Sequence, residues 1–311
     1  MPSLQPPAIA PPDTAENDPR LGHLLGDDPE PLSAVLLGFS VEEGVVRNGG
    51  RPGPAEAPDR LREQLYGMTP DARRGEAFRH LLRHTQDLGN LKNDGSLATR
   101  QAALGKSLAS HLRRETVPII LGGGHETAYG HFLGYAKAET DVTILNWDAH
   151  PDVRPLIENK PHSGSSFRQA LEHPSGCCQH YAVAGLQPHS TAAAHLQFID
   201  DQNGRYAWTD ELTRSVVDKQ YESLSGPTMV TFDLDAVDQA QAPGVSAPAV
   251  GGLDQDLWLH AAYRAGRCPQ VASVDIVELN PRVDVDDRTA RLAALTVMQV
   301  LRGLSDRREQ A

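Results

Sequence analysis

An apolar run that ends in alternating carboxylates constrains this chain more than any other feature. Residues 227–232 are predicted to form a buried β-strand, and Asp233 and Asp235 follow it at positions that point to the same face. An unpaired carboxylate is costly to bury, and a hydrophobic strand has no structural use for two of them. A cation at the end of the strand would remove that cost.

Two further predicted strands end in the same kind of side chain. The run 142–147 is followed by Asp148, His150 and Asp152, whose i, i+2, i+4 spacing places all three on one side of an extended segment. The run 117–121 is followed by glycines, which let the backbone turn tightly beside a ligand, and then by His125. Solvated acids at the start of a loop would explain any one of these residues, but not three strands that end alike.

The predicted metal ligands are His125, Asp148, His150, Asp152, Asp233 and Asp235. Carboxylates and imidazoles without a thiolate suit Mn²⁺ better than a structural zinc site. The number of ligands exceeds what one such ion usually takes from protein, so we expect two manganese ions per chain.

Apolar runs alternate with helical patterns along most of the chain. The predicted strands are 34–39, 117–121, 142–147, 180–184, 228–232 and 271–277, and the predicted helices are 58–66, 97–113, 127–138, 191–199, 209–224, 254–265 and 288–304. This alternation predicts an α/β fold with three αβα layers and a mostly parallel central sheet. Ligands then bind at the carboxyl ends of the strands, where the three acidic motifs fall. We expect residues 1–31 to form an N-terminal tail or arm and residues 32–311 to form a single catalytic domain.

Composition limits the partners that this chain is expected to have. It has 29 basic and 41 acidic residues, a net charge of −12, which argues against nucleic acid and anionic membranes. No apolar run approaches the ~20 residues of a membrane span. No secretory signal is evident, and an odd number of cysteines is no disulfide framework. We therefore predict a cytoplasmic protein that binds a small-molecule substrate and forms a homo-oligomer.

The three motifs together resemble those of the ureohydrolases, the family of arginase, agmatinase and formimidoylglutamase. They are Gly122-Gly123-Gly124-His125-Glu126, residues 146–152 and residues 231–238, and they match in order and spacing. The resemblance extends from about residue 34 to residue 304 and is strongest to the formimidoylglutamases. Supporting segments are 48–53, 152–155, 162–168, 242–248 and 277–281.

The resemblance implies an arginase-like fold and a role for each motif residue. It implies that His125, Asp148, Asp152 and Asp233 hold one ion, and that His150, Asp148, Asp233 and Asp235 hold the other. Ions placed in this way can share a water molecule and lower its pKa. Asp235 is then the expected proton shuttle to the leaving amine, and Glu278 is expected to pair with the amidinium of the substrate.

Substrate choice is expected to depend on Arg154, two residues after a predicted metal ligand. A guanidinium there would repel a cationic substrate and hold a carboxylate. Asn48 and Arg51 are candidates for a second carboxylate, although Arg51 is equally consistent with a structural loop arginine. Arginase and agmatinase carry a catalytic histidine directly before a glycine, where this chain has Ser163. His162 either reaches the leaving group or is an ordinary loop histidine.

These observations predict a manganese hydrolase that cleaves N-formimino-L-glutamate to L-glutamate and formamide in histidine degradation. One alternative is another ureohydrolase acting on a carboxylate-bearing guanidino compound such as guanidinobutyrate, which would use the same metal ligands. A second alternative is an inactive metal-binding regulatory protein. The complete ligand set argues against it, because a protein without activity has no physical reason to keep it.

Overall fold

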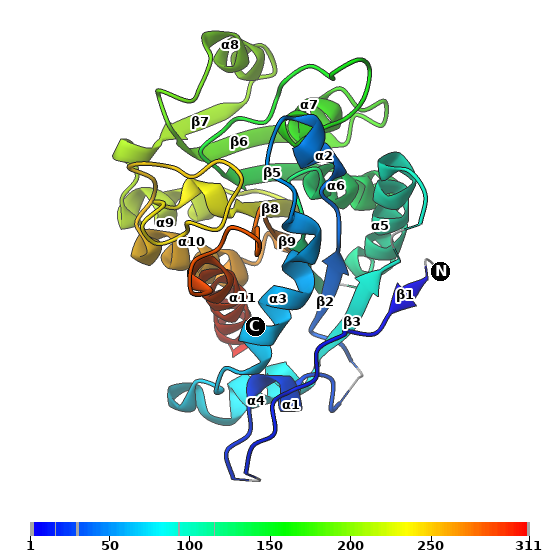
Figure 1. The fold of residues 1–311 in the computed structure, drawn as a ribbon, viewed down its shortest axis with the longest axis vertical. Coiled ribbons are helices and arrows are strands. Elements are labelled where there is room, and N and C mark those ends of the chain that lie inside the picture. The colour runs from blue at the N-terminus through cyan, green and yellow to red at the C-terminus, as the bar shows by residue number, and fades with distance from the viewer. Residues whose placement is uncertain (1–2, 16, 29–30, 93, 115, 310–311) are drawn as a thin grey trace.

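The computed structural model of the protein describes residues 3–15, 17–28, 31–92, 94–114 and 116–309. Its strands are β1 (Leu4–Gln5), β2 (Ala34–Phe39), β3 (Thr85–Leu91), β4 (Val117–Gly122), β5 (Val142–Trp147), β6 (Cys178–Leu186), β7 (Arg205–Trp208), β8 (Thr228–Asp233) and β9 (Val271–Val277). They form one sheet in the order β1-β3-β2-β4-β9-β8-β5-β6-β7 (Figure 1). β1 runs antiparallel to β3, and all the other neighbouring strands are parallel.

Helices cover both faces of this sheet. They are α1 (Leu21–Leu24), α2 (Glu43–Arg47), α3 (Ala57–Tyr66), α4 (Gly75–Arg83), α5 (Leu97–Leu112), α6 (Thr127–Ala138), α7 (Ser166–Leu171), α8 (Ala193–Asp201), α9 (Arg214–Glu222), α10 (Gln255–Arg267) and α11 (Arg288–Glu309). The core beneath α3, α4, α10 and α11 lies on one face, and α5 and α6 pack on the other. The predicted three-layer αβα fold is therefore confirmed.

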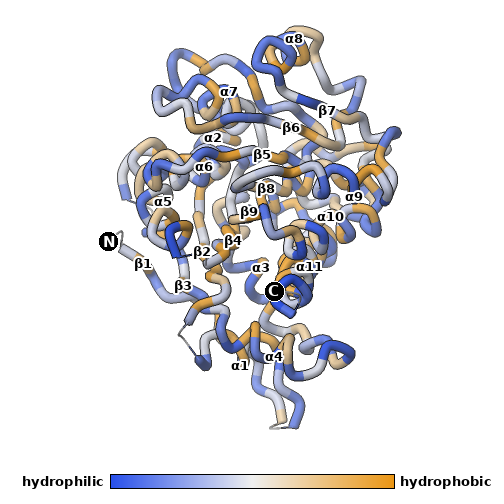
Figure 2. Tube along the Cα trace, turned by 180° about the vertical axis from the view of Figure 1, so that it is seen from behind, coloured by the Kyte–Doolittle hydropathy of each residue, from blue (hydrophilic) through white to orange (hydrophobic). Residues whose placement is uncertain are grey.

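The central strands are buried on both faces, which explains why they appear in the sequence as continuous apolar runs. In Figure 2 the hydrophobic residues are concentrated on inner segments such as β4 and β9. Successive side chains of β8 point to opposite faces of the sheet. Phe232 packs against Trp147 and Trp258, with ring centroids 6.4 and 5.1 Å apart. Thr231 points to the opposite face, as the period of a strand requires, and contacts His125 there.

β3 was not predicted, because its polar sequence does not look like a strand. Its Asp87 accepts hydrogen bonds from the fully buried Arg62 of α3 at 2.8 Å and from the hydroxyl of Tyr66 at 2.8 Å. These partners satisfy a carboxylate that would otherwise be costly inside the fold. The predicted helix 209–224 is also interrupted: Leu212 is extended, and α9 starts after Thr213, whose hydroxyl caps it.

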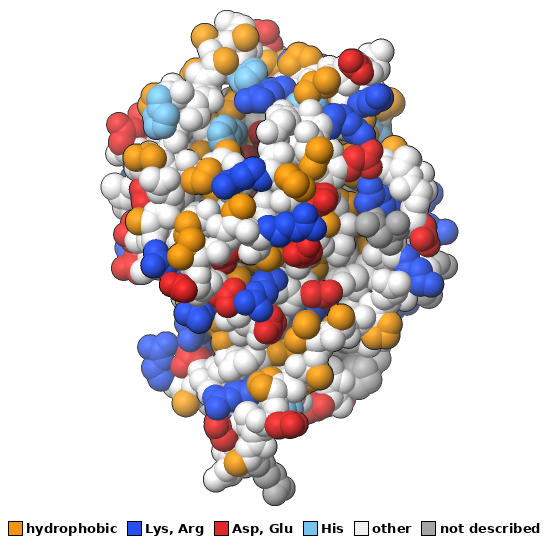
Figure 3. All heavy atoms as spheres, viewed as in Figure 1, with side chains coloured by type: hydrophobic (Ala, Val, Ile, Leu, Met, Phe, Trp, Pro, Cys, Tyr) orange, Lys and Arg blue, Asp and Glu red, His pale blue; other side chains and the backbone are white. Residues whose placement is uncertain are grey.

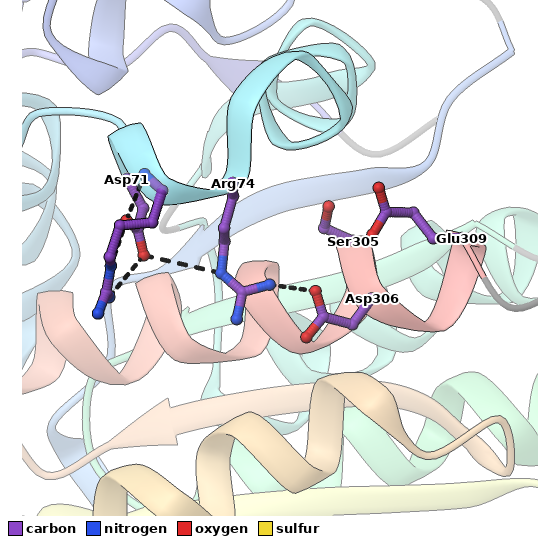
Figure 4. A pocket seen from close by; sticks show the side chains of 6 residues that line it. Asp71, Arg74, Ser305, Asp306 and Glu309 are labelled. Carbon is purple, nitrogen blue, oxygen red and sulfur yellow. Dashed lines mark hydrogen bonds and ion pairs between the residues drawn. The ribbon is translucent and has the colours of Figure 1, made fainter.

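Ion pairs join elements that are distant in the sequence. Arg74, which precedes α4, pairs with Asp306 of α11 (Figure 4). The nearby Asp71 contacts Arg73 at 2.9 Å and Arg302 of α11 at 3.0 Å. Basic and acidic side chains are interspersed over the face of the molecule in Figure 3. β1 pairs with β3 and forms one edge of the sheet, so this part of the N-terminal segment lies along the sheet. Among the described residues, no helix combines the length and apolar character needed to cross a membrane.

Candidate metal centre

Four neighbouring strands, β4, β9, β8 and β5, bring the predicted ligands and Glu278 to one edge of the sheet. His125 follows β4, Asp148 follows β5, Asp233 ends β8, and Glu278 follows β9. Because parallel strands present their carboxyl ends at the same edge, residues more than a hundred positions apart meet there. The fold therefore creates the cluster directly from its strand order.

The first group of donors surrounds the imidazole of His125. Its Nδ1 lies 2.8 Å from Oδ2 of Asp233, 3.0 Å from Oδ2 of Asp152 and 3.3 Å from Oδ2 of Asp148. One ring nitrogen carries at most one proton, so it cannot satisfy three carboxylates. Despite these short distances, the buried Nδ1 forms no hydrogen bond within the described residues. The opposite nitrogen, Nε2, lies 3.0 Å from the hydroxyl of Thr231, which orients the ring.

The second group contains His150, Asp148 and Asp235. Nδ1 of His150 lies 3.1 Å from Oδ2 of Asp235 and 3.5 Å from Oδ1 of Asp148. Asp148 thus faces one histidine with each of its oxygens and belongs to both groups. Asp233 belongs to the first group only, and its Oδ1 accepts a hydrogen bond from the backbone N–H of Asp235 at 2.9 Å. In the part of the chain that the structure describes, no other donors gather in this way.

The electrostatics of the cluster are those of a cation site. Burial disfavours protonation of His125, but the carboxylate of Asp233 and its neighbours outweigh burial and raise the pKa of this imidazole. The charge of Asp235 raises the pKa of His150 to about 12. Burial raises the pKa of Asp235 itself to about 6. The cluster therefore holds more negative charge than its own side chains neutralise, and divalent cations would compensate for it.

Two buried glutamates accept hydrogen bonds from the backbone around the donor cluster. Oε1 of Glu278 accepts a hydrogen bond from the backbone N–H of His125 at 2.7 Å, and Oε1 of Glu126 accepts one from Gly44 of α2 at 2.7 Å. Burial and the nearby Glu126 raise the pKa of Glu278. Asp152 and Glu278 adopt positive φ values of 45° and 67°, which are uncommon for residues other than glycine. Such strain is typical of functional sites.

All the donor residues except the fully buried Asp148 line a cleft of about 230 Å³. Its walls are formed by Val45, Asn48, Gly49, Gly50, His125, His150, Asp152, Arg154, Ser163, Asp233, Asp235, Ser246, Ala247 and Glu278. The exposed Arg154 lies at the rim, where its Nη1 donates to Oδ1 of Asn48 at 3.2 Å. A small cleft that joins acidic donors to one guanidinium can hold a substrate with a cationic end and an anionic end.

Three predicted site residues are absent from these walls: Arg51, His162 and the fully buried Asp148. The guanidinium of Arg51 donates to the carbonyl oxygen of Val245 and thereby connects two loops. His162 is fully buried, and its Nε2 lies 3.0 Å from the carbonyl oxygen of Pro155. Its neighbour Ser163 faces the cleft in its place.

Sequence reasoning gave no role to Glu126 or Ser163. Glu126 lies within the glycine-rich motif, and its contact with α2 connects the loop that bears Asn48 to the metal centre. Ser163 was noted only as a departure from the wider family. Its role could have been suspected because it is a polar residue at a position where arginase and agmatinase carry a catalytic histidine.

Comparison with known proteins places the fold and the motifs in one group. The model of the arginase family matches residues 32–302. The chain belongs to the arginase family. The resemblance predicted from the three motifs is therefore confirmed, and so is the arginase-like architecture.

Proteins that are similar to this chain include formimidoylglutamases. The protein of that name from Rhodococcus jostii (strain RHA1) is 39% identical over 293 residues, which cover 89% of this chain and 88% of the relative. A formimidoylglutamase from Geobacillus sp. (strain WCH70) is 36% identical over 279 residues, covering 86% of this chain and 82% of that one. The crystal structure of Trypanosoma cruzi formiminoglutamase with Mn²⁺₂ is 29% identical, has a TM-score of 0.85, and covers 93% of this chain and 99% of that chain.

Proposed function

We propose that this member of the arginase family is a formimidoylglutamase, which hydrolyses N-formimino-L-glutamate to L-glutamate and formamide. The observation that carries the proposal is Arg154, a guanidinium at the rim of a cleft whose base is built from carboxylates. The similar proteins named formimidoylglutamase support the same reaction. That reaction would give the chain a place in histidine degradation.

Two manganese ions are the cofactors that the donor set fits. The two groups, His125 with Asp148, Asp152 and Asp233, and His150 with Asp148 and Asp235, each bring their donor atoms within 4.8 Å of one another. Oxygen and imidazole donors suit Mn²⁺. The Trypanosoma cruzi formiminoglutamase was crystallised with Mn²⁺₂, two manganese ions, which supports the same content here. When bound, such ions supply an activated water molecule for hydrolysis.

Asp148 is the best candidate for a carboxylate shared between the ions. Its two oxygens face the two histidines, at 3.3 Å from His125 and 3.5 Å from His150. Asp233 as a second shared ligand remains a prediction, because it belongs to the first group only and faces His125 with Oδ2.

Two carboxyl groups in the cleft are suited to bind the substrate cation and to transfer a proton. Glu278 is held by the N–H of His125 and borders the cleft, where it would pair with the amidinium of the substrate. Asp235 has a buried Oδ1 with no hydrogen-bond partner among the described residues. Because it lies in the second donor group and also lines the cleft, this carboxyl group is placed to accept a proton and to pass it to the leaving amine.

The substrate is distinguished from its competitors by its charges. At the end away from the reacting carbon, agmatine has an ammonium, which Arg154 would repel, and arginine carries an ammonium next to its carboxylate, which weakens the attraction of Arg154 for that carboxylate. N-formimino-glutamate has carboxylates there, and a chain with a net charge of −12 needs a local cation to hold them. Guanidinobutyrate also has a carboxylate and is the second candidate substrate.

Comparison of four candidate substrates tests the proposal. Protein reconstituted with Mn²⁺ is incubated with N-formimino-L-glutamate, guanidinobutyrate, arginine and agmatine, and glutamate, formamide, urea and ammonia are measured. We expect glutamate and formamide from the first substrate, with kcat/KM at least about tenfold above that for any guanidine, since loss of one good contact costs that much. Preferential release of urea would assign the second function. A cytoplasmic location and a homo-oligomeric state are further parts of this proposal, which cell fractionation and sedimentation can test.

A further inference from the structure

Three polar side chains at the rim of the cleft form a directional chain of hydrogen bonds. Nη1 of Arg154 donates to Oδ1 of Asn48 at 3.2 Å, and Nδ2 of Asn48 donates to Oγ of Ser163 at 3.1 Å. A guanidinium can only donate, so its contact fixes the orientation of the Asn48 amide. The oxygen of this amide must face Arg154, and its nitrogen must face Ser163.

The direction of the chain determines where the hydroxyl proton of Ser163 points. Oγ of Ser163 accepts from Asn48, and within the described residues that hydroxyl has no acceptor of its own. Ser163 lines the cleft, as Arg154 and Asn48 do. The proton of Ser163 is therefore available to a ligand in the cleft. Because the chain begins at a positive charge, polarisation along it makes this hydroxyl a stronger donor.

The backbone holds the three residues in place from three segments. The N–H of Arg154 donates to the carbonyl oxygen of Gly164 at 2.8 Å, which fixes the loop of Arg154 beside that of Ser163. A Cβ at Gly164 would lie 3.1 Å from Nδ2 of Asn48 and 3.2 Å from Cδ of Arg154, so a side chain there would push these groups apart. Asn48 is the C-cap residue of α2, and the backbone N–H of Gly44 in the same helix donates to the carboxylate of Glu126.

We propose that Ser163 is a specificity-determining residue that donates its hydroxyl to a substrate carboxylate beside Arg154, and that Asn48 is the positioning residue that aims it. This inference rests on the proposed function, because a carboxylate ligand is assumed. It gives a substrate-binding role to a position where arginase and agmatinase carry a catalytic histidine. It also changes the part expected of Asn48, which orients two donors and does not have to contact the substrate itself.

The test compares substitutions of Ser163 in the Mn²⁺-loaded protein. Ser163→Ala should raise KM for N-formimino-L-glutamate and weaken L-glutamate binding, measured by calorimetry, by about 10- to 100-fold, the usual loss for a hydrogen bond to a charged group. kcat should change much less, and the manganese content should stay the same. Ser163→Cys keeps the shape with a weak donor, so we expect a similar loss. Ser246→Ala is the matched control, because that serine of the cleft wall already donates to the carbonyl oxygen of Arg51 and should affect KM far less.

A double substitution tests the direction of the chain. In Asn48→Asp the new carboxylate only accepts, so it should draw the Ser163 proton away from the cleft. Asn48→Asp should therefore weaken glutamate binding at least as much as Ser163→Ala, and adding Ser163→Ala to it should cause less than a further threefold loss. Additive losses would overturn the relay.

The outcomes separate this inference from the proposed function. If the wild-type protein is active and Ser163→Ala changes KM and glutamate affinity less than about threefold, only the role of Ser163 fails. Full affinity in Ser163→Cys together with a loss in Ser163→Ala would assign packing in place of donation, and would also overturn the inference. If the wild-type protein neither hydrolyses formimino-glutamate nor binds glutamate, the proposed function fails and the inference fails with it.

Discussion

Replacing Arg154 by alanine removes the only arginine or lysine side chain that lines the described cleft. The guanidinium is exposed at the rim, and its one observed contact is the hydrogen bond to Asn48. Arg154 is separated from the predicted ligand Asp152 by one residue, Val153. The substitution therefore removes charge from the entrance without removing a metal ligand.

The expected loss follows from this position. A charge-assisted hydrogen bond to a carboxylate contributes about 1.5–3 kcal/mol. Water screens an exposed guanidinium, so we expect a value near 2 kcal/mol, which corresponds to about 30-fold in kcat/KM. Arg154→Lys keeps the charge but not the planar fork and should recover only part of the loss.

The assay is steady-state hydrolysis of N-formimino-L-glutamate by wild type, Arg154→Ala and Arg154→Lys at equal manganese content. Arg154→Ala should mainly raise KM, because the lost contact is made in the ground state as well as in the transition state. A fall in kcat/KM of less than about threefold would refute the reasoning. It would also weaken the case for this substrate over a guanidino compound.

The remaining predictions concern metal content and stability. Asp148→Ala should lose both manganese ions and Asp152→Ala only one, measured by elemental analysis, and a chelator should abolish activity until Mn²⁺ is restored. Arg62→Ala leaves the buried carboxylate of Asp87 without its main partner, and denaturant unfolding should show a loss of about 3–5 kcal/mol. Neighbouring arginines, that of residue 73 foremost, lower the pKa of Asp71 from 3.8 to about 2. Because the pKa of Asp71 is lower in the folded state, its ionised carboxylate stabilises the fold at pH values above the pKa of the unfolded state. This stabilisation is lost as the pH falls toward 2. In Asp71→Asn, the free energy of unfolding should therefore decrease less on acidification than in the wild type.

The sequence was sufficient to predict the buried strands and to name the side chains that gather in the donor cluster. The predicted bounds of β2, β5 and β9 match the observed ones, because a parallel strand covered on both faces must be apolar throughout. The acidic residues that end such strands were therefore conspicuous, and parallel strand ends necessarily lie at one edge.

Features that depend on tertiary contacts could not be predicted. β3 is stabilised by Arg62, which comes from a helix more than twenty residues earlier, and nothing in the sequence of β3 signals that partner. The contact between Asn48 and Ser163 joins residues 115 positions apart and depends on how α2 packs against the glycine-rich motif. For the same reason, the sequence could not tell that Arg51 faces a backbone carbonyl and that Ser163, not His162, faces the cleft.

The most direct test of the proposed reaction is to identify which bond breaks at the amidine carbon. N-formimino-L-glutamate labelled with ¹³C at that carbon is mixed with Mn²⁺-loaded protein and followed by NMR. We predict labelled formamide and unlabelled L-glutamate in equal amounts, because the proton held by Asp235 goes to the amine of glutamate as it leaves. Labelled N-formyl-glutamate with ammonia, or no conversion by protein that holds both ions, would contradict the proposed reaction.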